Sequence, residues 1–235
     1  MKISEKRCVV LDMDGTVYLG NIPIPGAVEF IKKNWGKLDF HFLSNNTSKA
    51  PDTYVKKLNG MGIPATLDLI LSPTTPLVDF LKENSIHTAY IVGNRDFCRD
   101  LASRMPELKQ QEEGAQAVIL AYDTELTYEK LSRSAILLEN HPEVLFLATH
   151  LDKVCPSPEG PLPDVGSMLA LYKVATGRTP QHIFGKPDPT VLQPLLKKYR
   201  REEMVMAGDR LSTDKKLAEN AGIDFILVLS GEATL

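Results

Sequence analysis

Short apolar runs alternate with longer amphipathic stretches along almost the whole chain, and this alternation restricts the fold more than any other feature. Unbroken apolar runs of this kind suit strands that are covered on both faces, as in a parallel sheet. Alternating strands and helices predict an α/β fold with right-handed crossovers. The runs predicted as strands are "CVVLD", "FHFLSN", "AYIVG", "AVILAY", "VLFLATH", "MVMAGD" and "FILVLS".

The amphipathic stretches between these runs predict helices. In the last of them, Ser212 or Thr213 is predicted to cap the start and Gly222 to end the helix. The stretches are "GAVEFIKKNW", "TTPLVDFLKEN", "RDFCRDLASRM", "TYEKLSRSAILLEN" and "STDKKLAENAG".

Three of the predicted strands end in residues that can bind phosphate or metal. Asp12, Ser44 and Asp209 each stand at the carboxyl end of such a run. In open α/β sheets the ligand crevice lies beyond the carboxyl ends of the strands. If the three strands share one sheet, these side chains converge there although they are far apart in sequence.

The middle strands lack these polar endings and predict a second α/β unit. Turn-rich segments at 72–76 and 175–180 bracket it, as linkers around an insertion would. We therefore predict a Rossmann-like, doubly wound parallel-sheet core formed by residues 1–75 and 178–235. A large α/β cap, residues 76–177, is inserted into it.

Composition excludes several classes of protein. The 235 residues carry a formal net charge of -3, which gives no electrostatic case for nucleic acid. Three widely spaced cysteines form neither a disulfide framework nor a zinc-ligand pattern, and "MKISEKR" lacks the apolar stretch of a signal peptide. No apolar run approaches the ~20 residues that a membrane span needs. We expect a cytoplasmic protein without a membrane or nucleic-acid partner.

Four short motifs carry the candidate chemistry. "DMDGT" offers two carboxylates, but its glycine is fourth, so it does not fit a calcium-binding EF-hand loop. "FLSNNTSK" supplies a hydroxyl and two amides where a helix could start, which suits an anion. "FGKPDP" supplies Lys186, and "MAGDRLSTD" supplies Asp209 and Asp214. Each motif alone also fits a plain turn, helix cap or surface loop. Together they offer acids for a cation and donors for an anion.

In this order the motifs resemble the haloacid dehalogenase superfamily, in its phosphatase branch. More narrowly, "LDMDGTVYLGNIPIPGA", "FLSNNTS" and "GDRLSTD…NAGI…ILVLSGE" look like one subfamily. It contains p-nitrophenyl phosphatases, pyridoxal phosphate phosphatase, phosphoglycolate phosphatase and the NagD-type nucleotide phosphatases. The resemblance spans nearly the whole chain.

The resemblance implies a role for each core residue. Asp12 would be the nucleophile that forms an aspartyl-phosphate, and Asp14 would be the general acid and base. Mg²⁺ would be held by Asp12, the Asp14 backbone carbonyl and Asp209. Asp214 would orient metal-bound water or the lysine.

The resemblance also implies how the phosphate is bound. Ser44, Asn45 and the Asn46 backbone would hold its oxygens, and Lys186 would pair with both the phosphate and Asp12.

Substrate choice is predicted to reside in the cap loop 150–166, "HLDKVCPSPEGPLPDVG". Asp152 and Cys155 are its candidate substrate-binding residues, with His150 beside them. The alternative is a plain surface connection. Two positions depart from the family's usual pattern. His150 stands where "ATN-x-D" has asparagine, and "PDVG" stands where the family has "PG-x-G".

These observations predict a Mg²⁺-dependent phosphatase that hydrolyses small-molecule phosphomonoesters of the nucleotide, sugar or cofactor-phosphate kind. Two alternatives stay open, namely a phosphomutase or phosphotransferase on the same scaffold, and a non-catalytic protein that binds phosphorylated metabolites. The expected partner is a small phosphorylated metabolite. A homodimer formed through the cap is also kept open.

Overall fold

The computed structural model describes residues 5–157 and 159–232. The chain folds into two structural units, and each is made of segments that are separate in the sequence. The first comprises residues 1–44, 51–72 and 186–235, and the second comprises residues 45–50 and 73–185. Among the described residues, no helix is both long enough and apolar enough to span a bilayer.

The first unit is built on a parallel five-stranded sheet with the strand order β14-β13-β1-β4-β5. The chain leaves β1 toward β4 and β5 and returns on the other side of β1 with β13 and β14. The order therefore reverses between β1 and β13, where doubly wound sheets bind ligands. The strands are β1 (Cys8–Asp12), β4 (Asp39–Leu43), β5 (Ile70–Leu71), β13 (Met204–Gly208) and β14 (Asp224–Leu227).

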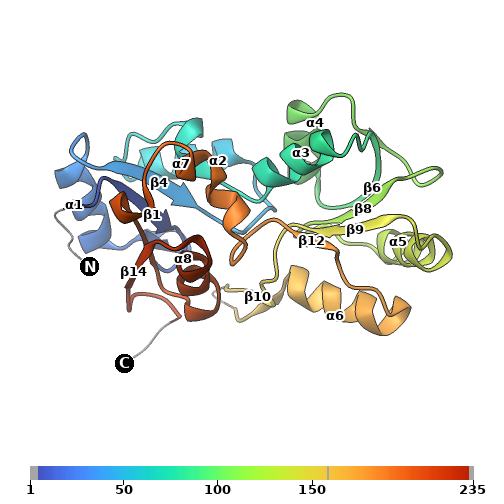
Figure 1. The fold of residues 1–235 in the computed structure, drawn as a ribbon. Coiled ribbons are helices and arrows are strands. Elements are labelled where there is room, and N and C mark those ends of the chain that lie inside the picture. The colour runs from blue at the N-terminus through green and yellow to red at the C-terminus, as the bar shows by residue number, and fades with distance from the viewer. Residues whose placement is uncertain (1–4, 158, 233–235) are drawn as a thin grey trace. The chain divides into compact units, whose positions relative to one another are not determined.

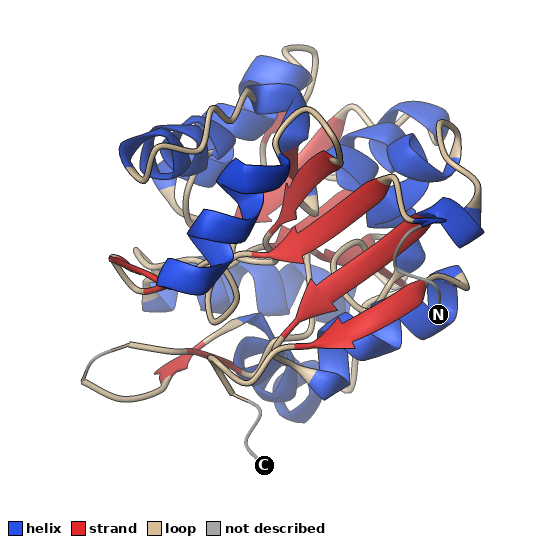
Figure 2. Cartoon of the chain, turned by 90° about the vertical axis from the view of Figure 1, so that its left-hand side faces the viewer, coloured by secondary structure: helices blue, strands red, loops and turns tan. Residues whose placement is uncertain are grey.

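Helices cover both faces of this sheet (Figure 2). In β1, Val9 and Leu11 belong to one apolar cluster and Cys8 and Val10 to another, because successive side chains of a strand point to opposite faces. The first cluster includes residues of α1 and α2, and the second includes residues of α7 and α8. The helices are α1 (Pro25–Asn34), α2 (Pro51–Gly60), α7 (Gln193–Leu196) and α8 (Lys216–Ala221).

Short elements complete the first unit. A small antiparallel hairpin follows β1. Short 3₁₀-helical turns precede β5, α7 and β13, and a π-helical turn precedes α8. They are β2 (Tyr18–Leu19), β3 (Ile22–Pro23), η2 (Leu67–Leu69), η3 (Pro189–Leu192), η4 (Arg201–Glu203) and η5 (Leu211–Lys215).

The second unit repeats this architecture with a parallel sheet of its own, in the order β12-β9-β8-β6-β7 (Figure 1). Helices α3 and α4 contribute to the apolar cluster on one face, and α5 and α6 to that on the other. The strands are β6 (Thr88–Val92), β7 (Lys109–Gln110), β8 (Ala117–Leu120), β9 (Leu145–Ala148) and β12 (His182–Ile183). The helices are α3 (Thr74–Glu83), α4 (Arg95–Arg104), α5 (Tyr128–Asn140) and α6 (Val165–Thr176).

The α/β fold class predicted from the sequence is confirmed, and all seven apolar runs contain strands of the two sheets. The units differ in extent from the predicted core and cap. Residues 178–185 belong to the second unit because β12 pairs with β9, and residues 45–50 belong to it as well. Assigning the units as catalytic core and cap is part of the proposal below.

The start of the last helix differs from its prediction. Neither Ser212 nor Thr213 caps it, because the chain first makes a wide π-helical turn, η5. The Asp214 side chain points back and accepts a hydrogen bond from the Arg210 backbone N–H at 3.0 Å. Gly222 ends the helix as predicted, with a φ of 68° that suits glycine.

The predicted cap loop also holds regular structure. A two-stranded antiparallel ribbon, β10 (Val154–Cys155) and β11 (Leu162–Pro163), lies within it. Helix α6 then begins at Val165, and Asp164 caps it by accepting a hydrogen bond from the Val165 N–H at 2.6 Å.

Candidate active site

Asp12 is the last residue of β1, and Lys186 is its partner. Both side chains are buried, with less than a tenth of their surface exposed. The Lys186 ammonium donates to the Asp12 carboxylate, and it also donates to Asp214 Oδ1 at 2.6 Å. One buried cation thus bridges two buried carboxylates in the first unit.

Asp209 follows β13, the strand that pairs with β1. Its Oδ2 accepts the Glu232 backbone N–H at 2.6 Å, whereas its buried Oδ1 has no hydrogen-bond partner in the described part of the chain. Gly15 packs against the same carboxylate. A Cβ at this position would lie 2.5 Å from Asp209 Oδ2, and its φ of 91° also favours glycine. The glycine of "DMDGT" therefore lets the loop after β1 approach Asp209.

Asp12, Asp209 and Asp214 each offer a carboxylate oxygen, and these oxygens lie within 4.8 Å of one another. All three residues are buried. Carboxylate oxygens are the ligands that Mg²⁺ prefers, and the partnerless Oδ1 of Asp209 is an acceptor that a cation would satisfy. The residues of this group therefore fit a hard divalent cation.

The electrostatics of the group follow from burial. Burial raises the pKa of Asp12 to about 8; Lys186 opposes this increase, and the Asp214 and Asp209 carboxylates add to it. An added cation would favour the ionised carboxylate. When its three carboxylates are ionised, the group therefore carries more negative charge than Lys186 alone neutralises.

Asp14 is more exposed than Asp12. Partial desolvation raises its pKa, against the lowering effects of a backbone hydrogen bond from Gly20 and the charge of Lys57. A carboxyl group with a raised pKa holds its proton at higher pH, as a general acid requires.

Ser44 directly follows β4, and its backbone N–H donates to the Leu71 carbonyl at 3.1 Å. Register places Asp12 opposite Leu43, so Ser44 stands one residue beyond the end of the strand beside Asp12. The structure therefore groups Ser44 with the acids and the lysine in the first unit.

Asn45 and Asn46 belong to the second unit, together with Asp152 and Cys155. Asn45 Nδ2 donates to Asp152 Oδ1 at 3.2 Å, and Asn46 Nδ2 lies 3.8 Å from Cys155 Sγ. The sequence placed the two asparagines in the core and the other two residues in the cap loop. These side-chain contacts between the two motifs were not predicted.

The segment that carries these asparagines lies across the carboxyl ends of β6, β8 and β9. The Tyr122 N–H donates to Thr47 Oγ1 at 3.0 Å, and Asn94 Nδ2 donates to the Ser48 carbonyl at 2.8 Å. Thr149 Oγ1 lies 3.5 Å from Thr47 Oγ1. These contacts explain why residues 45–50 group with the second unit.

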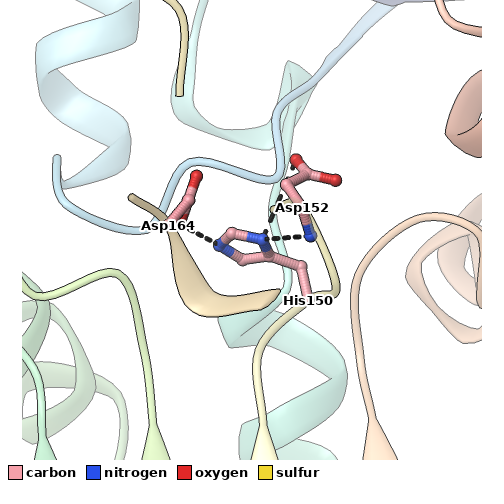
Figure 3. Close-up of side chains that lie close together, drawn as sticks. All are labelled: His150, Asp152 and Asp164. Carbon is pink, nitrogen blue, oxygen red and sulfur yellow. Dashed lines mark hydrogen bonds and ion pairs between the residues drawn. The ribbon is translucent and has the colours of Figure 1, made fainter. Parts of the chain in front are cut away.

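His150 lies at the start of the predicted substrate loop, with its ring between the carboxylates of Asp152 and Asp164 (Figure 3). The ring is fully buried. Sequence reasoning noted both His150 and the "PDVG" segment, but as separate departures from a pattern. Nothing in the sequence indicated that they meet.

Comparison with known proteins identifies the relatives of this chain. Residues 9–104 match a family model described as haloacid dehalogenase-like hydrolase, and a second HAD-like hydrolase model matches residues 183–235. An acid sugar phosphatase from Staphylococcus saprophyticus is 32% identical over 232 residues, which cover 97% of this chain and 88% of the relative.

Solved structures agree with this relationship. A 4-nitrophenylphosphatase from Thermotoga maritima is 38% identical with a TM-score of 0.91, covering 98% of this chain and 88% of that one. A glycerol phosphate phosphatase from Mycobacterium tuberculosis, solved in complex with magnesium, is 27% identical with a TM-score of 0.87. That match covers 98% of this chain and 69% of the relative.

Proposed function

Because the chain belongs to the haloacid dehalogenase-like hydrolases, in the branch of NagD-type and p-nitrophenyl phosphatases, we propose that it hydrolyses small phosphomonoesters with the help of Mg²⁺. The observation that carries the proposal is the group at the reversal of strand order. There Asp12 is bridged by Lys186 to Asp214, and Asp209 stands beside them. We assign this first unit as the catalytic core and the second as the cap.

In this mechanism Asp12 is the nucleophile. One of its oxygens attacks phosphorus, the bond to the leaving alcohol breaks, and an aspartyl-phosphate forms. Lys186 places positive charge where the attacking carboxylate and the phosphate oxygens meet, which reduces their mutual repulsion. Asp214 holds that ammonium from the other side.

Asp14 is the general acid and base. It protonates the leaving alcohol and then removes a proton from the water that hydrolyses the aspartyl-phosphate, a contribution of typically ~10²–10⁴-fold. The raised pKa of its carboxyl group supports the first of these roles.

Mg²⁺ would be held by Asp12 and Asp209, whose carboxylate oxygens lie within 4.8 Å of each other. The family resemblance adds the Asp14 backbone carbonyl as a third ligand. When bound, it neutralises charge on the transferring phosphoryl group. Ser44 and Asn45, with the Asn46 backbone, are the proposed phosphate donors. The resemblance of "FLSNNTS" to the family motif supports this assignment.

The relatives carry names for three kinds of phosphoester, a sugar phosphate, p-nitrophenyl phosphate and glycerol phosphate. We propose a substrate of this class, a small phosphorylated metabolite. A screen of phosphomonoesters in Mg²⁺ and again in EDTA tests the proposal. Release of inorganic phosphate that EDTA abolishes supports hydrolysis, whereas transfer to an added alcohol indicates a phosphotransferase. No reaction with any ester contradicts both.

Asp209→Asn should raise the Mg²⁺ concentration needed for half-maximal activity. The amide keeps the shape of the side chain but removes the charge that the cation needs. Loss of residues that merely support metal ligands costs about 10- to 100-fold in affinity or activity, so an effect of at least this size is expected. The measurement is a Mg²⁺ titration, with Asp79→Asn on the exposed side of α3 as the control. An unchanged titration would remove Asp209 from the proposed ligands.

Asp152 and Cys155 are proposed to contact the leaving group. Asp152→Asn or Cys155→Ser should therefore change relative kcat/KM among phosphoesters with different leaving groups. Acetyl phosphate is small and featureless, so its hydrolysis should stay nearly constant. A uniform decrease for every substrate would place specificity elsewhere.

A further inference from the structure

The ring of His150 lies between Asp152 and Asp164, which come from opposite ends of one loop. His150 Nε2 lies 3.6 Å from Asp164 Oδ1, and Nδ1 lies 3.8 Å from Asp152 Oδ2 (Figure 3). Nδ1 accepts the Asp152 backbone N–H at 3.4 Å, so Nδ1 carries no hydrogen and the ring hydrogen is on Nε2. The 3.6 Å contact of Nε2 with Asp164 is longer than a hydrogen bond and is electrostatic. The ring is fully buried, and both carboxylates are at most a tenth exposed.

The two ends of the loop also meet through their backbones. The Gly166 N–H donates to the Asp152 carbonyl at 2.8 Å, and the Asp164 N–H donates to the Lys153 carbonyl at 3.0 Å. A Cβ at Gly166 would collide with the Leu151 carbonyl oxygen. The start of α6 is thus packed directly on residues 151–153, with the imidazole ring beside this contact.

The alternative role for His150, Asp152 and Asp164 is to bind a metal ion. Ligand atoms of the three residues do lie within 4.8 Å of one another. However, the closest contacts of the two carboxylates are to different ring nitrogens, which lie on different edges of the imidazole. A single ion can bind through only one of them. The geometry therefore favours a bridge in which the ring joins the Asp152 backbone N–H to the Asp164 carboxylate.

The contact needs both side chains. An asparagine at position 150 would be too short to place a donor where Nε2 stands, and a glycine at position 164 would offer no carboxylate. Each residue therefore supplies the partner that the other needs.

We propose that His150 is a positioning residue that fixes the substrate loop 150–166 through Asp164 and Asp152. This inference rests on the proposed function, because it deepens the role of that loop. Asp152 in turn accepts a hydrogen bond from Asn45 Nδ2 at 3.2 Å, so the bridge reaches the motif that carries the proposed phosphate donors. A carboxylate can only accept hydrogen bonds, so the substrates served are phosphoesters whose leaving group carries hydroxyl or amine donors.

Kinetics of substituted proteins test the proposal. His150→Asn and Asp164→Gly should each raise KM for a sugar phosphate about tenfold, with kcat for acetyl phosphate within about twofold of the unsubstituted value. The double substitution should be no worse than the worse single one, since both remove the same bridge. His150→Gln should recover part of the loss, because its amide reaches the place of Nε2. His87→Asn, at an exposed position of the same unit, is the control.

Hydrogen exchange tests the bridge without any catalysis. The amides of Val165 and Gly166, which bond to Asp164 and Asp152, should exchange about tenfold faster in His150→Asn and unchanged in His87→Asn. Unchanged exchange, additive kinetic effects or equal losses on every substrate would overturn the proposal. If the unsubstituted protein hydrolyses no phosphoester, the proposed function and the substrate part of this inference are wrong. The hydrogen-exchange measurement still tests whether the bridge exists.

Discussion

Asp12→Asn should abolish phosphatase activity without weakening the fold. The amide keeps the shape of the side chain but is no longer a nucleophile, so we expect kcat to fall by about 10³- to 10⁶-fold, as when other enzymes lose their nucleophile. The measurement is hydrolysis of p-nitrophenyl phosphate at saturating Mg²⁺. Asp79→Asn, exposed on α3, should leave the rate unchanged. Undiminished hydrolysis by Asp12→Asn would overturn the assignment of the nucleophile.

Asp12→Asn should increase stability in the absence of metal, although it abolishes activity. Burial raises the pKa of Asp12 to about 8 in the metal-free protein, whereas the unfolded chain has an ordinary carboxyl pKa near 4. The folded state therefore holds a proton that the unfolded state has lost between these values. The free energy of unfolding accordingly decreases as pH rises through this range. Asn has no such proton, so in EDTA the substituted protein should gain stability relative to the parent from about pH 5 to about pH 8.

Much of the fold could be predicted because its signals are local. Each apolar run is short and unbroken, which is what a strand buried on both faces requires. β1 shows the reason, since Val9 and Val10 belong to clusters on opposite faces of the sheet. Helix α6 was not predicted, because the residues "VGSMLALYKVAT" are apolar on most sides and Val174 is 89% exposed. Its sequence therefore lacks the clear polar face that marks an amphipathic helix.

The central acids of the site could be predicted for a topological reason. Parallel neighbouring strands end at the same edge of a sheet, so Asp12 and Asp209 had to be close once β1 and β13 were neighbours. Lys186 lies outside any strand, and only the resemblance to a family motif implied that it pairs with Asp12. Its ion pairs with Asp12 and Asp214 provide a physical reason for a buried lysine there.

Contacts between loops could not be predicted in the same way. Asn45 and Asp152 are far apart in sequence and lie outside regular periodic segments, so no pattern relates them. The same holds for His150 and Asp164. Such contacts form between loop residues, and the hydrophobic pattern of a single sequence does not encode how loops pack against each other.

Lys186→Met should lower both the phosphatase activity and the free energy of unfolding. A second substitution should restore stability but not activity. Methionine preserves much of the length of the side chain but removes a buried cation that bridges Asp12 and Asp214. Breaking a buried ion pair by removing one partner typically destabilises a protein by about 3–5 kcal/mol, because charge is left uncompensated. Urea unfolding in EDTA above about pH 8, where Asp12 is ionised, should show a loss of this order. Phosphatase activity should fall by at least about 10²-fold because the charge beside the nucleophile is gone.

A second substitution distinguishes uncompensated charge from loss of packing. Asp214→Asn, added to Lys186→Met, removes one of the two carboxylates that the lysine neutralised. It should therefore restore a large part of the lost free energy of unfolding, while activity stays low because Lys186 is still absent. Mg²⁺ should also stabilise the single variant more than it stabilises the parent, since a cation can replace part of the missing charge. A double variant no more stable than Lys186→Met would show that the lysine contributes by packing and not by charge.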